Sequence, residues 1–192
     1  LAKEAGVTAV VDAGLAPGIP NYLLGFHNSQ MEIDTFEYYV GGLPKYPKPP
    51  FNYKAPFSPI DVIEEYTRPA RMMVNGQIVT KPALSGIETM NFEKIGTLEA
   101  FNTDGLRSIL FTMKHIKNMK EKTLRYSGHA ALMANYRNAG KFNDDQILKT
   151  SKELFEAWKL ETNEPEVTVM KIIIKGESKS ISYDLFDEYD SS

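Results

Sequence analysis

An arginine and a histidine lie close together in Lys122-Thr-Leu-Arg-Tyr-Ser-Gly-His129, and both side chains could do chemistry. Alternation along a strand places Thr123 and Arg125 on one face. A guanidinium beside a hydroxyl, followed by a Ser-Gly turn, can bind a carboxylate through two parallel hydrogen bonds. His129 opens the next helix and is a candidate acid or base. Arg125 has a second interpretation, as a surface cation or as the partner of an acidic neighbour that holds the sheet together.

A second polar cluster ends the segment Leu98-Glu-Ala-Phe-Asn-Thr-Asp-Gly105. A predicted strand stops there in three polar residues and a glycine, and a helix follows. Asn102, Thr103 or Asp104 would cap that helix in a purely structural interpretation. In the functional interpretation, Thr103 and Asp104 point into a pocket at the end of the strand. The residues alone leave both interpretations open.

The turn Gly14-Leu-Ala-Pro-Gly18 lies between a predicted buried strand and a predicted helix. Ligands of open α/β sheets bind at the carboxyl ends of strands, and the free N–H groups of a helix N-terminus attract anions. The turn is therefore either a contact for a cofactor or substrate, or a tight strand-to-helix connection. It is not a GxGxxG nucleotide fingerprint, and the 192 residues contain none.

Other catalytic patterns are missing from the sequence. His27 and His115 fall within predicted helices, where a structural or surface role is the simpler interpretation. There is no HExxH, GxSxG or P-loop motif, so zinc proteolysis, serine hydrolysis and nucleotide hydrolysis have no motif. The chain has no cysteine, which excludes disulfides and thiolate metal sites and fits a reducing cytoplasm. No metal site is predicted.

Composition excludes several further classes of protein. The chain carries 22 basic and 25 acidic residues, a formal net charge of −3, without a basic stripe, so nucleic-acid binding has no electrostatic basis. No apolar run approaches the ~20 residues that span a bilayer, and the first residues lack a signal-peptide core. With 42% hydrophobic residues, the chain is expected to be a soluble globular protein of the cytoplasm.

The first residues are expected to end another structural unit. Leu1–Ala5 has the pattern of the last turn of a helix with Gly6 as its C-cap. Val7–Val11 is a nearly continuous apolar run, typical of a strand buried on both faces of a parallel sheet. A lone parallel strand cannot satisfy its own hydrogen bonds, so we expect its partners upstream. A helix from Pro20 to about Gln30 follows.

The remaining segments alternate between strands and helices. Strands are predicted at 32–40, 69–74, 77–81, 87–92, 97–101, 122–126, 166–174 and 179–185, and helices at 58–66, 106–116, 129–139 and 149–159. Asn75-Gly76 predicts a type I′ hairpin, Ser58 with Asp61 an approximate capping box, and the proline-rich 43–56 a loop. This order predicts an α+β fold with a mixed, largely antiparallel sheet and helices on one face.

Six collinear segments carry a family resemblance that spans nearly the whole chain. They are Asp-Ala-Gly-Leu-Ala-Pro-Gly-Ile, Val-Gly-Gly-Leu-Pro, Pro-Pro-Phe-Asn-Tyr-Lys, Glu-Tyr-Thr-Arg-Pro-Ala-Arg, Leu-Glu-Ala-Phe-Asn-Thr-Asp-Gly-Leu-Arg and Glu-Lys-Thr-Leu-Arg-Tyr-Ser-Gly-His. Together they resemble the saccharopine dehydrogenase family, and its lysine 6-dehydrogenase-like branch is the most similar. Six motifs of this length seldom coincide by chance.

The resemblance implies a domain arrangement. In that family an N-terminal Rossmann domain binds NAD(P), an α+β domain supplies the substrate site and the subunit interface, and a final segment returns to the first domain. Residues 1–30 would then end the nucleotide-binding domain, and residues 31–192 would form the substrate-binding and dimerisation domain, cut at both ends. The main NAD or NADP motif would lie outside this chain, and a homodimer acting on a small amino acid is expected.

The resemblance also implies roles for single residues. Gly14, Pro17 and Gly18 match the loop on the nicotinamide side of the cofactor, and Ser58 matches a serine of a Trp-Ser-Pro element in which Phe57 replaces the tryptophan. Asp104 and Gly105 match the substrate-side turn, and Thr123, Leu124 and Arg125 match the segment that holds the substrate. His129 stands where several relatives have histidine, after a Tyr-Pro-Gly that is Tyr126-Ser-Gly here. Asp104, which would receive the amino end of the substrate, and His129 are the catalytic candidates.

The activity implied is hydride transfer from an amine-bearing carbon to the nicotinamide, followed by hydrolysis of the imine. Such a site must fix the substrate carboxylate, for which an arginine serves. It must also keep the amine neutral, for which a base with a pKa near neutrality serves. Two alternatives stay open, a non-catalytic ligand-binding or dimerisation module and a carboxyalkyl-polyamine dehydrogenase of the same family.

Overall fold

Eight strands form one sheet in the computed structural model, which describes residues 1–55 and 58–189. The strands are β1 (Thr35–Pro44), β2 (Ala70–Val74), β3 (Gln77–Lys81), β4 (Glu88–Phe92), β5 (Gly96–Asn102), β6 (Asn118–Tyr126), β7 (Glu166–Lys175) and β8 (Ser180–Tyr189). Their order is β3-β2-β6-β1-β7-β8, and the β4–β5 hairpin joins β6 through β5. The β1–β6 pair is parallel and the other pairs are antiparallel, so the prediction of a mixed, largely antiparallel sheet is confirmed.

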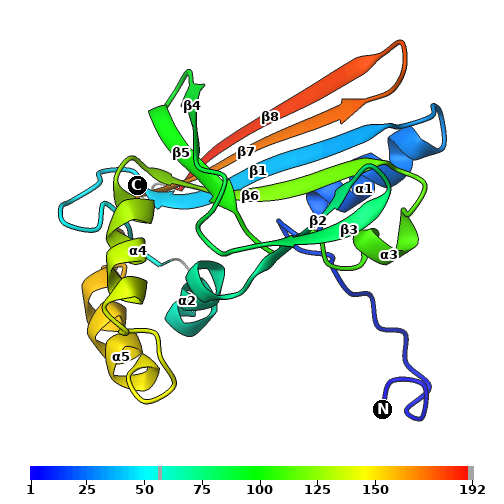
Figure 1. The fold of residues 1–192 in the computed structure, drawn as a ribbon. Helices are drawn as coiled ribbons and strands as arrows, with labels where there is room; N and C mark the ends of the chain where they lie inside the picture. Colours follow the sequence, from blue (N-terminus) through cyan, green and yellow to red (C-terminus); the bar gives the residue numbers. More distant parts are fainter. Residues whose placement is uncertain (56–57, 190–192) are drawn as a thin grey trace.

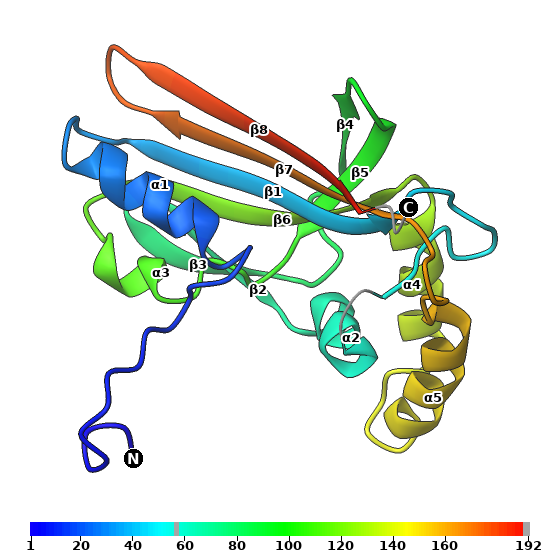
Figure 2. The same cartoon turned by 180° about the vertical axis from the view of Figure 1, so that it is seen from behind.

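The helices lie in two groups below the sheet (Figures 1 and 2). They are α1 (Ile19–Asn28), α2 (Pro59–Thr67), α3 (Ile109–Thr112), α4 (His129–Asn138) and α5 (Ile147–Trp158). The first group is α1 with α3, and the second is α2 with α4 and α5, near the end of the sheet where β5 and β6 finish. The β4–β5 hairpin stands on the other side of the sheet in Figure 1. No helix in the described part of the chain is long and apolar enough to cross a membrane.

The N-terminal segment differs from its prediction in one respect. Gly6, with a φ of 65°, caps the first turn as predicted, because the N–H groups of Gly6 and Val7 donate to the carbonyls of Lys3 and Ala2. Val7–Val11, however, forms no strand, and Val10 and Val11 are exposed. The predicted strand is therefore wrong for this structure, since no described strand lies beside it and a strand exists only through pairing.

Several other predicted boundaries moved, and three of these changes bear on the site. The helix predicted at 106–116 is reduced to α3, because Arg107 has a left-handed φ of 48° that a helix cannot contain. β1 does not stop before Gly41 but pairs with β7 as far as Pro44. β6 begins at Asn118 rather than at Lys122. The hairpin turn was predicted correctly, with positive φ at Asn75 and Gly76.

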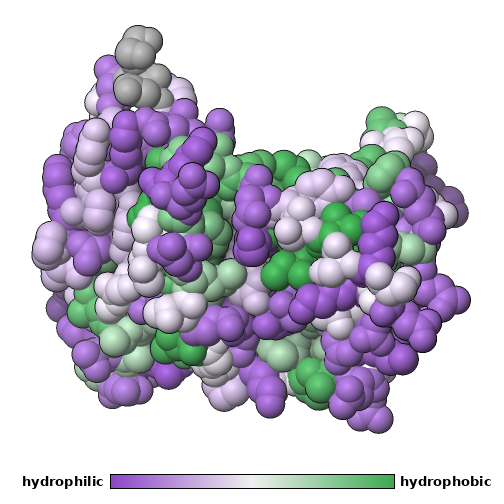
Figure 3. Space-filling view, turned by 90° about the horizontal axis from the view of Figure 1, so that it is seen from above, coloured by the Kyte–Doolittle hydropathy of each residue, from purple (hydrophilic) through white to green (hydrophobic). Residues whose placement is uncertain are grey.

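Two hydrophobic clusters hold the sheet and helices together. One gathers β1, β6 and the second helix group and includes Leu43, Leu124, Tyr66, Met133 and Trp158. The other gathers β1, β7 and the first helix group and includes Phe36, Tyr38, Ile172, Leu24 and Ile109. Figure 3 looks onto the sheet from above, where apolar residues show as separate patches among hydrophilic ones.

Gly41 of β1 lies close against Leu124 of β6, and this generates a prediction. A Cβ at this position would lie 2.8 Å from the Leu124 carbonyl oxygen, a backbone atom fixed in the sheet. We expect Gly41→Ala to lower the free energy of unfolding by about 1–3 kcal/mol in urea titrations.

Gly25 in α1 provides the matched control for that experiment. A Cβ at Gly25 meets no atom within 4 Å, so Gly25→Ala should stabilise the protein by about 0.5–1 kcal/mol through its effect on helix formation. Equal effects of the two substitutions would show that the β1–β6 contact tolerates a methyl group.

Candidate functional site

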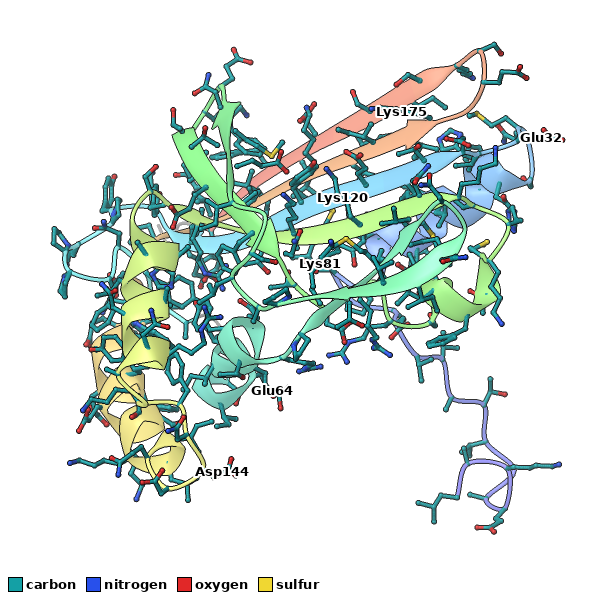
Figure 4. All side chains as sticks on the ribbon, viewed as in Figure 1. Glu32, Glu64, Lys81, Lys120, Asp144 and Lys175 are labelled. Carbon is teal, nitrogen blue, oxygen red and sulfur yellow. The ribbon has the colours of Figure 1, made fainter. Side chains whose placement is uncertain are left out.

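A cleft lies beneath the sheet, between α2 and the turn that precedes α1. It consists of two adjoining cavities of about 270 and 420 Å³, which share Ala16, Val40, Glu65 and Thr123 as lining residues. The first cavity is also lined by Pro17, Asp61, Glu64, Arg68, Thr103, Asp104, Gly105, Arg107 and Glu121. The second continues along Leu15, Gly41, Gly42, Arg125, Glu166 and Thr168. In Figure 4 the labelled Glu64 marks α2, one wall of this cleft.

The turn at residues 14–18 forms a second wall. The Gly14 N–H donates to the Pro17 carbonyl (3.0 Å), and the Ile19 N–H donates to the Gly14 carbonyl (3.1 Å), so the turn folds back on itself. A Cβ at Gly18 would overlap the backbone of Gly14, which explains glycine at this position. Leu15 is 39% exposed, and with Pro17 it presents an apolar edge to the cleft.

Glu121 lines the first cavity and is 4% exposed. The Thr103 hydroxyl lies 2.7 Å from Oε2 and 2.8 Å from Oε1, and the Gly105 N–H donates to Oε2 (3.0 Å). The Thr123 hydroxyl lies 2.9 Å from that of Thr103. Burial raises the pKa of Glu121 to about 7, although the hydrogen bond from Thr103 opposes the shift. This carboxyl therefore changes charge near neutral pH, a property that is common in functional sites.

Asp104 also lines the first cavity, but its carboxylate already has a partner. Arg71 contacts both oxygens, from Nε to Oδ1 (2.9 Å) and from Nη2 to Oδ2 (2.8 Å), and its backbone N–H adds a third bond (3.1 Å). Arg107 lies 4.0 Å from the same carboxylate. Gly105 completes this turn, and its carbonyl accepts a hydrogen bond from the Tyr38 hydroxyl (2.7 Å). The turn is thus held rigidly beside Glu121.

Arg125 borders the second cavity but is 2% exposed and fully engaged. Its Nη2 lies 2.6 Å from the Glu65 carboxylate, its Nη1 donates to the Leu124 carbonyl (2.8 Å), and its guanidinium stacks on Tyr53 at 4.3 Å. Burial opposes its charge, but Tyr53, Tyr66 and Glu65 raise the pKa of Arg125. The structure therefore supports the second interpretation of Arg125, in which the guanidinium pairs with an acidic neighbour. It is not free to clamp a carboxylate.

His129 lies behind Arg125, outside the cleft lining. Its Nδ1 is 2.8 Å from the Phe51 carbonyl, so it donates there, and Nε2 accepts from the Tyr66 hydroxyl (2.8 Å). Burial, together with the charge of Arg125, lowers the pKa of His129 to about 3. A neutral, buried imidazole with both nitrogens bonded supports the packing of Tyr66. In this arrangement the His129 imidazole, predicted to act as an acid or base, does not reach the cleft.

Two further predicted residues lie away from the cleft. Leu124 is completely buried and points into the hydrophobic core, on the face of β6 opposite Thr123, so only its backbone is near the site. Ser58 occupies the N-cap position of α2 as predicted, without the predicted side-chain hydrogen bond. It lines a separate hollow with Ser151 and Phe155. Its neighbour Phe57 lies outside the described residues.

The sequence interpretation missed Glu121 and Glu65. Strand alternation would have placed Glu121 on the same face as Thr123 and Arg125, but the predicted strand began four residues too late, at Lys122 instead of Asn118, and so left Glu121 out. Glu65 faces the site only because α2 packs below β6, which no local pattern indicates. No group of histidine, aspartate and glutamate in the described part of the chain is arranged to hold a metal ion.

A sheet, a helix and a glycine-rich turn that enclose one polar cleft define an α+β domain. Residues 14–192 match the saccharopine dehydrogenase C-terminal domain, and the chain belongs to this family. The predicted family is therefore confirmed.

Known relatives agree with this assignment. The chain is 26% identical over 156 residues to the mitochondrial alpha-aminoadipic semialdehyde synthase of Bos taurus, covering 74% of this chain and 17% of that protein. It is 28% identical over 170 residues to the alpha-aminoadipic semialdehyde synthase of Arabidopsis thaliana, covering 80% of this chain and 16% of that protein. The chain thus spans less than a fifth of the length of these relatives.

A solved structure of saccharopine dehydrogenase (L-Glu forming) from Saccharomyces cerevisiae has the same fold. It superimposes with a TM-score of 0.72 at 16% sequence identity and covers 96% of this chain and 61% of that chain. The α+β architecture is therefore that of a saccharopine dehydrogenase.

The Arg125–Glu65 pair generates a prediction about stability. Arg125→Met would leave the half-buried Glu65 carboxylate without its partner, so we expect a loss of about 1–3 kcal/mol in the free energy of unfolding. Adding Glu65→Gln to that variant should recover at least about 1 kcal/mol relative to the sum of the two single effects. Additive effects in this cycle would show that the two side chains do not depend on each other.

Proposed function

We propose that this chain is the substrate-binding and dimerisation part of an NAD(P)-dependent amino-acid oxidoreductase of the saccharopine or lysine dehydrogenase type. The observation that carries the proposal is a single cleft in which Pro17, of the turn expected on the cofactor side, faces Gly105 and Thr123, of the segments expected on the substrate side. Family membership and the dehydrogenase named among the similar structures support the same chemistry. Residues 1–30 would belong to the nucleotide-binding domain.

The cofactor, when bound, supplies the acceptor for the hydride that leaves the amine-bearing carbon. Leu15 and Pro17 would lie against its nicotinamide ring. No GxGxxG motif occurs in these 192 residues, so the phosphates of NAD or NADP would be held by another part of the protein. We place the reaction in the cytoplasm, although the bovine relative is mitochondrial by name.

The charge of the cleft favours a cationic substrate. Five acidic residues (Asp61, Glu64, Glu65, Asp104 and Glu121) and two arginines (Arg68 and Arg107) line the first cavity. Glu64, Glu65 and Asp104 pair with arginines, and the two carboxylates that remain, Asp61 and Glu121, would attract ammonium groups. This observation keeps a carboxyalkyl-polyamine as the second candidate substrate beside lysine and saccharopine.

The direct test is oxidation of lysine, saccharopine, glutamate and a carboxyalkyl-polyamine by the full-length protein with NAD⁺ or NADP⁺, followed through the reduced nicotinamide. We expect activity with at least one amine-bearing substrate. Thermal stabilisation by an amino acid without any turnover would instead favour the non-catalytic ligand-binding module.

Thr123, which borders both cavities, offers a site-specific version of this test. Thr123→Val keeps the shape of the side chain but removes the hydroxyl that bonds Thr103. We expect kcat/KM to fall about tenfold, roughly the net contribution of one hydrogen bond. The matched control, Thr80→Val on the exposed strand β3, should keep full activity, and equal activities of the two variants would contradict this location of the site.

We further propose a symmetric homodimer formed through the sheet. Of the described strands, only β7 pairs with β8, so the outer edge of this ten-residue strand offers free backbone groups. Sedimentation of the full-length protein at tens of micromolar should give a dimer. A Pro substitution at Ser182, within β8, should weaken it, and a monomer throughout the concentration range would contradict the proposal.

A further inference from the structure

Among the described residues, Glu121 is the buried carboxyl of the cleft that forms no ion pair with a protein cation; Asp61 and Glu166 also form none, but they are exposed and half-buried. Glu65 is paired with Arg125, Asp104 with Arg71, and Glu64 with Arg68. Among the residues that the structure describes, no lysine, arginine or histidine forms an ion pair with Glu121, whose partners are the Thr103 hydroxyl and the Gly105 N–H. Burying an ionised carboxyl without a counter-ion is costly, so its place at the cleft calls for a cation from outside the protein.

We propose that Glu121 binds the amine of the substrate and takes up its proton. The inference rests on the function proposed above, since it names the residue that meets the amine in the same cleft. Thr123, on the same face of β6, and the rigid Asp104-Gly105 turn keep the carboxyl directed toward the cavity.

The proton transfer balances without any other reactant. One N–H bond of the bound ammonium breaks, an O–H bond forms on the Glu121 carboxylate, and the nitrogen keeps the electron pair. The resulting neutral amine can then form the C=N bond as hydride leaves the adjacent carbon for oxidised NAD(P). The hydroxyls of Thr103 and Thr123, 2.9 Å apart, connect the carboxyl to the cavity, through which the proton returns to water.

The groups around Glu121 act mostly against its ionisation. Those that face it across the cleft or in contact with it are Tyr38 of β1, Asp104 and Arg107 after β5, Asp61, Glu64, Glu65 and Arg68 of α2, and Asp12 before α1. Burial makes the largest contribution to its raised pKa, and the negative charges of Glu65 and Asp104 add to it. A bound ammonium would reverse this balance and favour the carboxylate.

Release of a proton from Glu121 when an ammonium ligand binds is therefore the observation that would identify this role. With a pKa of about 7, Glu121 is half protonated at pH 7 before ligand arrives. Binding an ammonium should release about half a proton per site at this pH, wherever the shared proton finally lies. Affinity should weaken about tenfold between pH 8 and pH 6, because binding requires the carboxylate, which protonates as pH falls through the pKa.

The experiment is titration calorimetry of the full-length protein with L-lysine and L-saccharopine, in two buffers that differ in protonation enthalpy. The wild type should show the proton release and the pH dependence, and Glu121→Gln should lose both while keeping its hydrogen bonds to Thr103 and Gly105. The control is Glu37→Gln, a carboxylate on the opposite face of neighbouring β1 that pairs with Lys120. It should behave as the wild type.

Folding of the variant has its own pH signature. The pKa of Glu121 is higher in the folded protein than the ordinary 4.5, so its ionisation destabilises the fold as pH rises from about 4.5 to above 7. Glu121→Gln should thus unfold at a higher urea concentration than the wild type at pH 8, and at a similar one at pH 5. If this variant fails to fold, carbon-13 NMR of wild-type carboxyl groups should still show the pKa of Glu121 falling by about one unit or more on lysine binding.

The outcomes separate this inference from the proposed function. Ligand binding by the wild type without proton release, or with a release that persists in Glu121→Gln, would overturn the role of Glu121 and leave the proposed function intact. Failure of the wild type to bind either ligand or to oxidise any amine would overturn both.

Discussion

β1 and β6 run parallel at the centre of the sheet, with Thr35 opposite Asn118 and Val40 opposite Thr123. Parallel neighbours cannot be joined by a tight turn and need a long crossover. Here the crossover carries α2 below the sheet and returns through β5 to place Asp104 and Gly105 beside β6. Val40 and Thr123 consequently border the same cleft as α2. Any loss of this pairing, which depends on the close approach at Gly41, would separate the walls of the site.

Charge is distributed unevenly along the face of β6 that borders the cleft. Arg125 and Glu65 neutralise each other within the protein, and their network with Tyr66 and His129 supports α2 from behind. Glu121, two positions before Thr123, has only neutral hydrogen-bond donors. One ion pair thus holds the cleft wall in place, and the buried Glu121 carboxyl has no counter-ion among the described residues.

Local patterns in the sequence predicted the elements better than the site. Hydrophobic periodicity, Asn75-Gly76 and the cap at Gly6 indicated real structures, because short-range sterics and hydrogen bonds decide them. The apolar run Val7–Val11 predicted a strand that the structure does not contain, because strand formation depends on a partner strand and not on the run itself. The partner of Arg125 was unpredictable, because Glu65 is sixty residues away and meets it only through the packing of α2. The family motifs did bring Pro17, Asp104, Gly105 and Thr123 to one cleft.

The claim at the centre of this account is that the cleft between the turn at residues 14–18, α2 and β6 holds the substrate. A crystal structure of the full-length protein with NAD(P) and its best amine substrate or a non-reactive analogue would test it most directly. We expect the ligand between Pro17 and Thr123, with its amine within hydrogen-bond distance of the Glu121 carboxyl. A ligand bound elsewhere, with this cleft filled only by water, would contradict the account.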